Sequence, residues 1–113
     1  MDYSKLDGLI PAVIQDDATK DVLMVGFMNA EAFARTRATG YITFFSRTRQ
    51  KLWTKGDTSG NRLRVVSLQS DCDADTILAR VICEGAGAVC HTGTRTCFTT
   101  TLDAEAVPAQ VRQ

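Results

Sequence analysis

A chain of 113 residues has room for one domain with a modest core, so we expect a single domain over residues 1–113, structured at about 8–101 and followed by a polar tail at 102–113. The 13 basic and 13 acidic residues cancel, which leaves no net field that would favour nucleic acid or an anionic membrane. No apolar run approaches the roughly 18 residues of a membrane span, and the N-terminal residues lack a signal-peptide pattern, so we expect a cytoplasmic protein.

Apolar runs separated by turn-forming residues predict the first strands and one helix. The runs at 9–15 and 22–28 flank a polar turn and are expected to form a strand–turn–strand unit. Asn29 is a favourable N-cap and Gly40 a favourable C-terminal cap, so a short helix is expected between them. Four apolar residues share one face of this helix: Ala30, Phe33, Ala34 and Ala38.

Beyond the helix the sequence becomes rich in β-forming segments. Short apolar or alternating stretches predict further strands at residues 41–45, 51–55, 62–68 and 76–82. Gly85, Gly87 and Gly93 then indicate an irregular stretch. The fold class expected from the residues is mainly β (α+β), a mostly antiparallel domain with one or two short helices.

Three aspartates alternate with other residues in a five-residue window. In an extended chain Asp71, Asp73 and Asp75 project to one side and Cys72 to the other. Clustered carboxylates repel one another and favour a cation, and hard oxygen ligands suit Mg²⁺ or Mn²⁺. A solvated acidic turn without a metal is compatible with the same pattern.

The four cysteines indicate a metal site more than disulfides, because thiols stay reduced in the cytoplasm. Cys72, Cys90 and Cys97 could supply three zinc ligands and leave a fourth position for water, as in catalytic zinc sites. Cys83 follows apolar residues, and we expect it only to pack. His91 is the only histidine and adjoins a candidate ligand, so both a structural and a catalytic role stay open.

A basic segment at residues 46–61 combines cations, hydroxyls and glycines around one tryptophan. Arginine forks and backbone N–H groups in such a loop can hold phosphate, and Trp53 could stack on a base. The candidate phosphate contacts are Arg47, Arg49, Lys55 and Ser59. The alternative is a charged hairpin whose tryptophan belongs to the core.

Taken together, four motifs resemble the phosphoribosyl-AMP cyclohydrolase family of histidine biosynthesis. They are VLMVGFMN at 22–29, SRTR with LWTKGDTSGN at 46–61, DCDAD at 71–75, and CHTG with CF at 90–98. The resemblance extends from about residue 8 to residue 99, and the motifs occur in the family's order.

This resemblance implies a zinc-dependent hydrolase that opens the N1–C6 bond of the purine ring of 1-(5-phosphoribosyl)-AMP, a phosphorylated nucleotide. The residues that it assigns to zinc are Cys72, Cys90 and Cys97, and those that it assigns to magnesium are Asp71, Asp73 and Asp75. His91 is then the natural catalytic base beside a zinc-activated water. The resemblance also implies a β-rich, barrel-like fold in an intertwined homodimer, with each active site built from both subunits. The length of the chain leads us to expect the cyclohydrolase activity alone.

Residues 82–89 depart from the family's usual pattern, because this link is about two residues longer and lacks a usual proline. Two further hypotheses stay open, and this departure motivates the first of them. One is a related enzyme that acts on another purine nucleotide. The other is a non-catalytic, zinc-stabilised nucleotide-binding module in which His91 is the fourth ligand.

Overall fold

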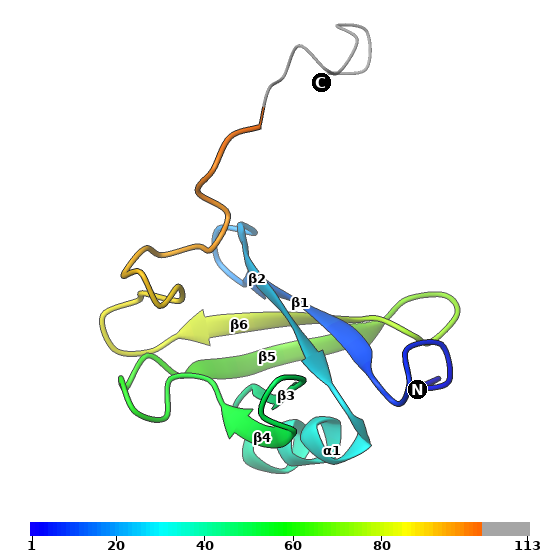
Figure 1. Ribbon diagram of the computed structural model, residues 1–113. Helices are drawn as coiled ribbons and strands as arrows, with labels where there is room; N and C mark the ends of the chain where they lie inside the picture. The colour runs from blue at the N-terminus through cyan, green and yellow to red at the C-terminus, as the bar shows by residue number, and fades with distance from the viewer. Residues whose placement is uncertain (103–113) are drawn as a thin grey trace, which may run out of the picture.

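The computed structural model describes residues 1–102 (Figure 1). Residues 103–113, which make up nearly all of the predicted polar tail, lie outside the described residues. The elements are β1 (Ile10–Asp16), β2 (Val22–Met28), α1 (Ala30–Thr39), β3 (Thr43–Ser46), β4 (Lys51–Thr54), β5 (Leu63–Ser70) and β6 (Ile77–Cys83). Each strand and the one helix expected from the sequence is present.

The strands form a four-stranded sheet in the order β2-β1-β6-β5 and a separate hairpin of β3 and β4. Three of the four pairings are antiparallel, and β1 pairs with β6 in parallel. The prediction of a mainly β, mostly antiparallel domain is confirmed. Within residues 1–102 of one chain, however, the strands form an open sheet with an adjacent hairpin rather than a closed barrel (Figure 1).

The core lies on one face of the sheet, because buried side chains alternate along its two central strands. They are Ile10, Ala12 and Ile14 of β1 and Ile77, Ala79 and Val81 of β6. Burial of each larger aliphatic side chain contributes roughly 1.5–3 kcal/mol. The opposite face carries apolar side chains that this chain leaves open, since Val25 is 44% exposed and Ile82 is 42% exposed.

Helix α1 begins and ends at the predicted caps. The side chain of Asn29 accepts a hydrogen bond from the backbone N–H of Ala32 at 2.8 Å. Gly40 adopts a left-handed conformation with φ of 79°, and its N–H donates to the carbonyl of Thr36 at 2.9 Å. In the described part of the chain, no helix is long and apolar enough to cross a membrane.

The buried face of α1 differs from the alanine-rich face that the sequence suggests. Ala32 and Thr36 are buried, whereas Ala30, Ala34 and Ala38 are exposed. The Thr36 hydroxyl donates to the carbonyl of Ala32 and accepts the N–H of Thr43 at 3.0 Å. A threonine can therefore occupy the inward position, because backbone groups satisfy its hydroxyl.

Candidate functional site: a cationic cleft beside two thiols

A cleft of about 840 Å³ lies between the β3–β4 region and the segment that follows β6. This volume falls within the range of small-molecule sites. One wall carries the predicted substrate residues Arg49, Trp53, Lys55 and Ser59, together with Lys51. The other wall carries Cys90 and His91. Residues about forty positions apart in the chain therefore line the same cleft.

Hairpin geometry explains the position of Trp53. Its cross-strand partner is Phe44, and the two ring centroids lie 5.2 Å apart. The ammonium of Lys55 lies 5.7 Å from the centroid of the indole ring. Trp53 is still 38% exposed, so it packs on a core aromatic residue and also presents surface to the cleft.

Arg47 lies apart from this group, although the sequence places it in the same motif. Its guanidinium carbon lies 4.1 Å from the centroid of the Phe27 ring, a cation–π contact. Arg47 does not line the cleft in this chain. Its role as a substrate contact stays a prediction.

The unusual segment at 82–89 packs directly against the basic motif. The side-chain oxygen of Asn61 accepts the N–H of Ala86 at 2.8 Å, and the N–H of Glu84 donates to the carbonyl of Arg62. Gly85 has φ of 71°, and a Cβ there would lie 2.5 Å from the Asn61 side-chain oxygen. The segment is therefore held where it can carry Cys90 to the cleft.

The two thiols that follow this segment lie close together. The Thr92 hydroxyl donates to Cys90 Sγ at 3.0 Å and, with the Thr92 backbone, lowers the pKa of the Cys90 thiol to about 6. His91 Nδ1 lies 4.0 Å from the same sulfur. Desolvation of its sulfur raises the pKa of Cys97, and the neighbouring Cys90 adds to this rise. Soft donors beside an easily formed thiolate suit zinc.

Thr92→Val is expected to raise the pKa of Cys90, because the variant loses the hydroxyl that stabilises the thiolate. The pKa is measured from the pH dependence of Cys90 alkylation by iodoacetamide in metal-free protein, followed by peptide mass spectrometry. In the native protein the rate at Cys90 should rise through about pH 6. In the variant this rise should move to higher pH and the rate at pH 6 should fall several-fold, since only the thiolate reacts. Thr94→Val is the matched control, because Thr94 is a smaller contributor to the same shift. An unchanged profile in Thr92→Val would contradict the assignment.

The third predicted zinc ligand, Cys72, does not join the other two within the chain. Cys72 lies in the turn before β6, whereas Cys90 follows β6, and the two segments lie at opposite ends of the sheet (Figure 1). Seven strand residues span about 20 Å. In the described residues, the aspartate cluster is the only group of three potential ligands with all ligand atoms within 4.8 Å of one another.

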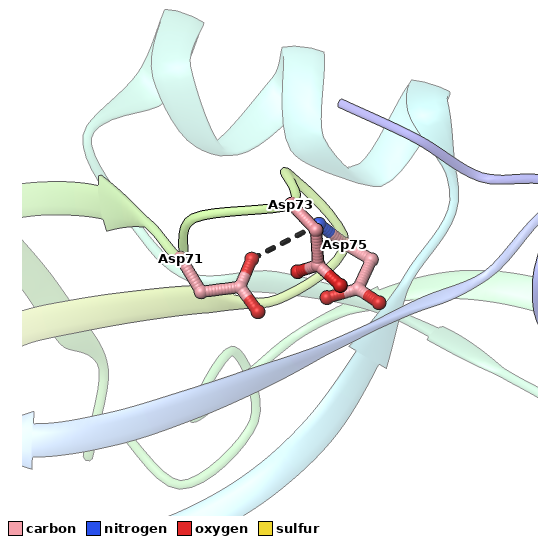
Figure 2. Close-up of side chains that lie close together, drawn as sticks. All are labelled: Asp71, Asp73 and Asp75. Carbon is pink, nitrogen blue, oxygen red and sulfur yellow. Dashed lines mark hydrogen bonds between the residues drawn. The ribbon is translucent and has the colours of Figure 1, made fainter.

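The aspartate cluster is formed by a tight turn (Figure 2). Asp71 accepts the backbone N–H groups of Asp75 at 3.0 Å and Thr76 at 3.1 Å. Ala74 adopts a left-handed conformation with φ of 59°, which bends the chain back. The convergence of the three carboxylates is as predicted, but the extended conformation used to predict it is wrong.

A lysine that the sequence did not suggest occupies this cluster. Lys5 Nζ lies 2.8 Å from Asp73 Oδ2 and 2.9 Å from Asp75 Oδ2. The ammonium strongly lowers the pKa of Asp75, and the two carboxylates raise the pKa of Lys5. The cluster therefore holds a cation already, and its oxygen ligands fit a hard divalent ion. None of its members lines the cationic cleft, so the two predicted sites are separate within one chain.

Comparisons with known proteins identify the family of the chain. The family model described as phosphoribosyl-AMP cyclohydrolase matches residues 24–99. The chain is 54% identical over 104 residues to the phosphoribosyl-AMP cyclohydrolase of Solibacter usitatus, covering 92% of this chain and 82% of that protein.

Two longer relatives are histidine biosynthesis bifunctional proteins HisIE. Identity is 57% over 98 residues with that of Bacteroides thetaiotaomicron and 52% over 98 residues with that of Escherichia coli. Each alignment covers 87% of this chain and 47% of the relative, so the chain spans about half the length of these proteins. The family match covers both the cationic cleft and the thiol pair, and the chain belongs to the phosphoribosyl-AMP cyclohydrolase family.

Proposed function

We propose that this protein hydrolyses the N1–C6 bond of 1-(5-phosphoribosyl)-AMP in histidine biosynthesis, with zinc as its catalytic metal. The observation that carries the proposal is the cleft itself, in which cations and a half-exposed tryptophan face a histidine and a thiol of lowered pKa. Four free cysteines support a location in the reducing cytoplasm.

Cys90 and Cys97 would hold the zinc, and Cys72 would come from a second copy of the chain. Two observations support the homodimer. The described chain does not assemble the three thiols, and its outer sheet face leaves Val25 and Ile82 exposed. When bound, zinc lowers the pKa of a water molecule towards neutrality and so supplies hydroxide at physiological pH.

The residues of the cleft then have distinct tasks. Arg49, Lys51 and Lys55 bind the phosphates of the substrate, and the exposed surface of Trp53 stacks on the purine. His91 accepts the proton of the attacking water and returns it to N1. The water oxygen bonds to C6, the C6–N1 bond breaks, and its electron pair stays on N1. C6 keeps its amino group and becomes a carboxamide carbon.

The aspartate cluster would hold Mg²⁺ and direct it towards substrate phosphate. Its three carboxylates supply the oxygen ligands that Mg²⁺ prefers. Because Lys5 occupies the same carboxylates, its ammonium must leave before a metal ion can bind there. Lys5 thus competes with the metal ion for the same carboxylates.

Lys5→Ala is expected to tighten Mg²⁺ or Mn²⁺ binding by about three- to tenfold, since the competing ammonium is removed and exposed ion pairs are individually weak. Isothermal titration of zinc-loaded protein measures the affinity. Lys20→Ala is the matched control, because Lys20 pairs with Asp17 in another turn. Weaker metal binding in Lys5→Ala, or equal tightening in the control, would contradict the competition.

The proposed activity is tested with purified zinc-loaded protein and a panel of purine nucleotides. Ring opening of phosphoribosyl-AMP changes its ultraviolet absorbance, and mass spectrometry detects the addition of one water. Turnover of phosphoribosyl-AMP but not AMP or ATP is the expected result. Preference for another purine nucleotide would favour the related enzyme. Tight binding without turnover would favour the non-catalytic module.

A further inference from the structure

Arg95 joins the loop that carries the thiols to the turn between β1 and β2. Its Nη1 donates to Asp21 Oδ2 at 2.7 Å, and its Nη2 donates to Asp16 Oδ2 at 2.9 Å. Nη2 also donates to the Thr19 hydroxyl at 2.8 Å. One guanidinium thus connects to three side chains more than seventy residues away in sequence.

The acceptors are themselves fixed by the turn. Asp16 Oδ1 accepts the backbone N–H groups of Ala18 at 2.8 Å and Thr19 at 3.0 Å, which leaves Oδ2 for Arg95. A guanidinium presents several N–H donors in a fixed planar fork that can reach both carboxylates and the hydroxyl, whereas the ammonium of lysine is a compact point charge. The turn is therefore a preformed receptor for arginine at position 95.

Cys90 and Cys97 are held by different parts of the structure. Cys90 begins a small turn closed within the loop, since its carbonyl accepts the N–H of Gly93 and its N–H donates to the carbonyl of Thr94. Cys97 is held from outside, because its N–H donates to the carbonyl of Leu23 at 2.8 Å. The distance between the thiols therefore depends on how the second half of the loop attaches to the β1–β2 unit.

Arg95 lies where the loop attaches to the β1–β2 unit, and it does not line the cationic cleft. It lines a smaller cleft of about 460 Å³ with Asp16 and Cys83, and it is absent from the lining of the cationic cleft. Ala88 and Gly93 line both clefts, so the loop lies between them. Arg95 is consequently placed to act on the thiols through the loop and not on substrate.

We propose that Arg95 is a positioning residue that sets the spacing of Cys90 and Cys97, and thereby the affinity and ligand geometry of the metal site. The role in metal binding rests on the proposed function; the role in thiol spacing does not. Exposed ion pairs each contribute little to stability. Removal of the Arg95 guanidinium should therefore leave the fold intact and change the spacing of Cys90 and Cys97.

Arg95→Gln tests this role in two measurements. Competition with a chromophoric chelator should show zinc affinity weakened by roughly 10- to 100-fold, the usual effect of losing an outer partner of a metal site. Cobalt(II) bound in place of zinc should give a weaker or shifted thiolate charge-transfer band. Arg35→Gln is the matched control, because Arg35 pairs with Glu31 within helix α1, outside the thiol loop and the segment before it, and should leave both unchanged.

A third measurement needs no metal. Diamide oxidises two adjacent thiols to a disulfide and is itself reduced to the hydrazine, so the rate of Cys90–Cys97 linkage in metal-free protein reports their spacing. Arg95→Gln should slow this linkage several-fold, as measured by peptide mass mapping. Equal linkage rates in Arg95→Gln and the native protein would overturn the positioning role. If the native protein binds no zinc or cobalt while the linkage rates differ, the zinc site fails and the spacing role stands.

Discussion

Cys90→Ser is expected to remove zinc and cyclohydrolase activity together. Cys90 is the thiol that the structure brings to the cleft, and its lowered pKa makes it the more readily deprotonated of the two adjacent candidate ligands. Serine keeps the size of the side chain but has no thiolate to offer. Activity should fall by more than the roughly 10- to 100-fold that loss of an outer partner of a metal site produces. Metal analysis of the purified variant and the absorbance assay measure both effects on one sample.

Cys83→Ser is the matched control for this change. Cys83 is a free thiol at the end of β6, and its sulfur lies 3.6 Å from the carbonyl oxygen of Glu84, away from the cationic cleft. The Cys83→Ser variant should therefore keep both its zinc and its turnover. The thermal unfolding temperature of metal-free Cys90→Ser should match that of the metal-free native protein, because Cys90 makes no core contact. Full turnover in zinc-free Cys90→Ser would end the zinc mechanism.

Local patterns in the sequence were sufficient to predict the elements. The caps of α1 depend on the chemistry of Asn29 and Gly40, and both residues form the expected hydrogen bonds. The two runs at the N-terminus form a hairpin because a polar turn separates them. Such features involve residues within a few positions of one another, where propensity and turn chemistry decide the structure.

Long-range pairings could not be predicted in the same way. The parallel pairing of β1 with β6 joins segments more than sixty residues apart, and nothing in either strand specifies the partner. Lys5 and Arg95 were likewise missed, because their acceptors lie 68 to 79 residues away. No pattern in the sequence links an exposed lysine or arginine to an acceptor that is distant along the chain.

The position of Cys72 shows a further limit of motif spacing. The motifs group it with Cys90 and Cys97, yet β6 separates it from them in the chain. Its neighbours Asp71 and Asp73 belong to a different cluster, which Lys5 occupies. The shared motif set therefore does not place the three thiols together within the described chain, and the proposed zinc site needs Cys72 from a second copy.

Mixing two inactive variants is expected to restore activity if the site is built across subunits. Cys72→Ser removes the thiol at one end of the sheet, and Cys97→Ser removes a thiol at the other end. Each variant alone should lose zinc and turnover, because each of its sites lacks one ligand. In a mixed dimer, one site combines the intact Cys72 of one subunit with the intact Cys90 and Cys97 of the other, and its second site lacks both replaced thiols.

Random reassortment of equal amounts makes half of the dimers mixed, so recovery should reach about a quarter of native activity, as two-fold symmetry requires. Co-expression with two affinity tags gives the mixed dimer in pure form, where half of the native activity is expected. A mixture of Cys90→Ser with Cys97→Ser is the control, because both changes fall in the same half of the site and every site stays defective. No recovery in the first mixture, or recovery in the control, would show that the three thiols do not meet across a dimer interface.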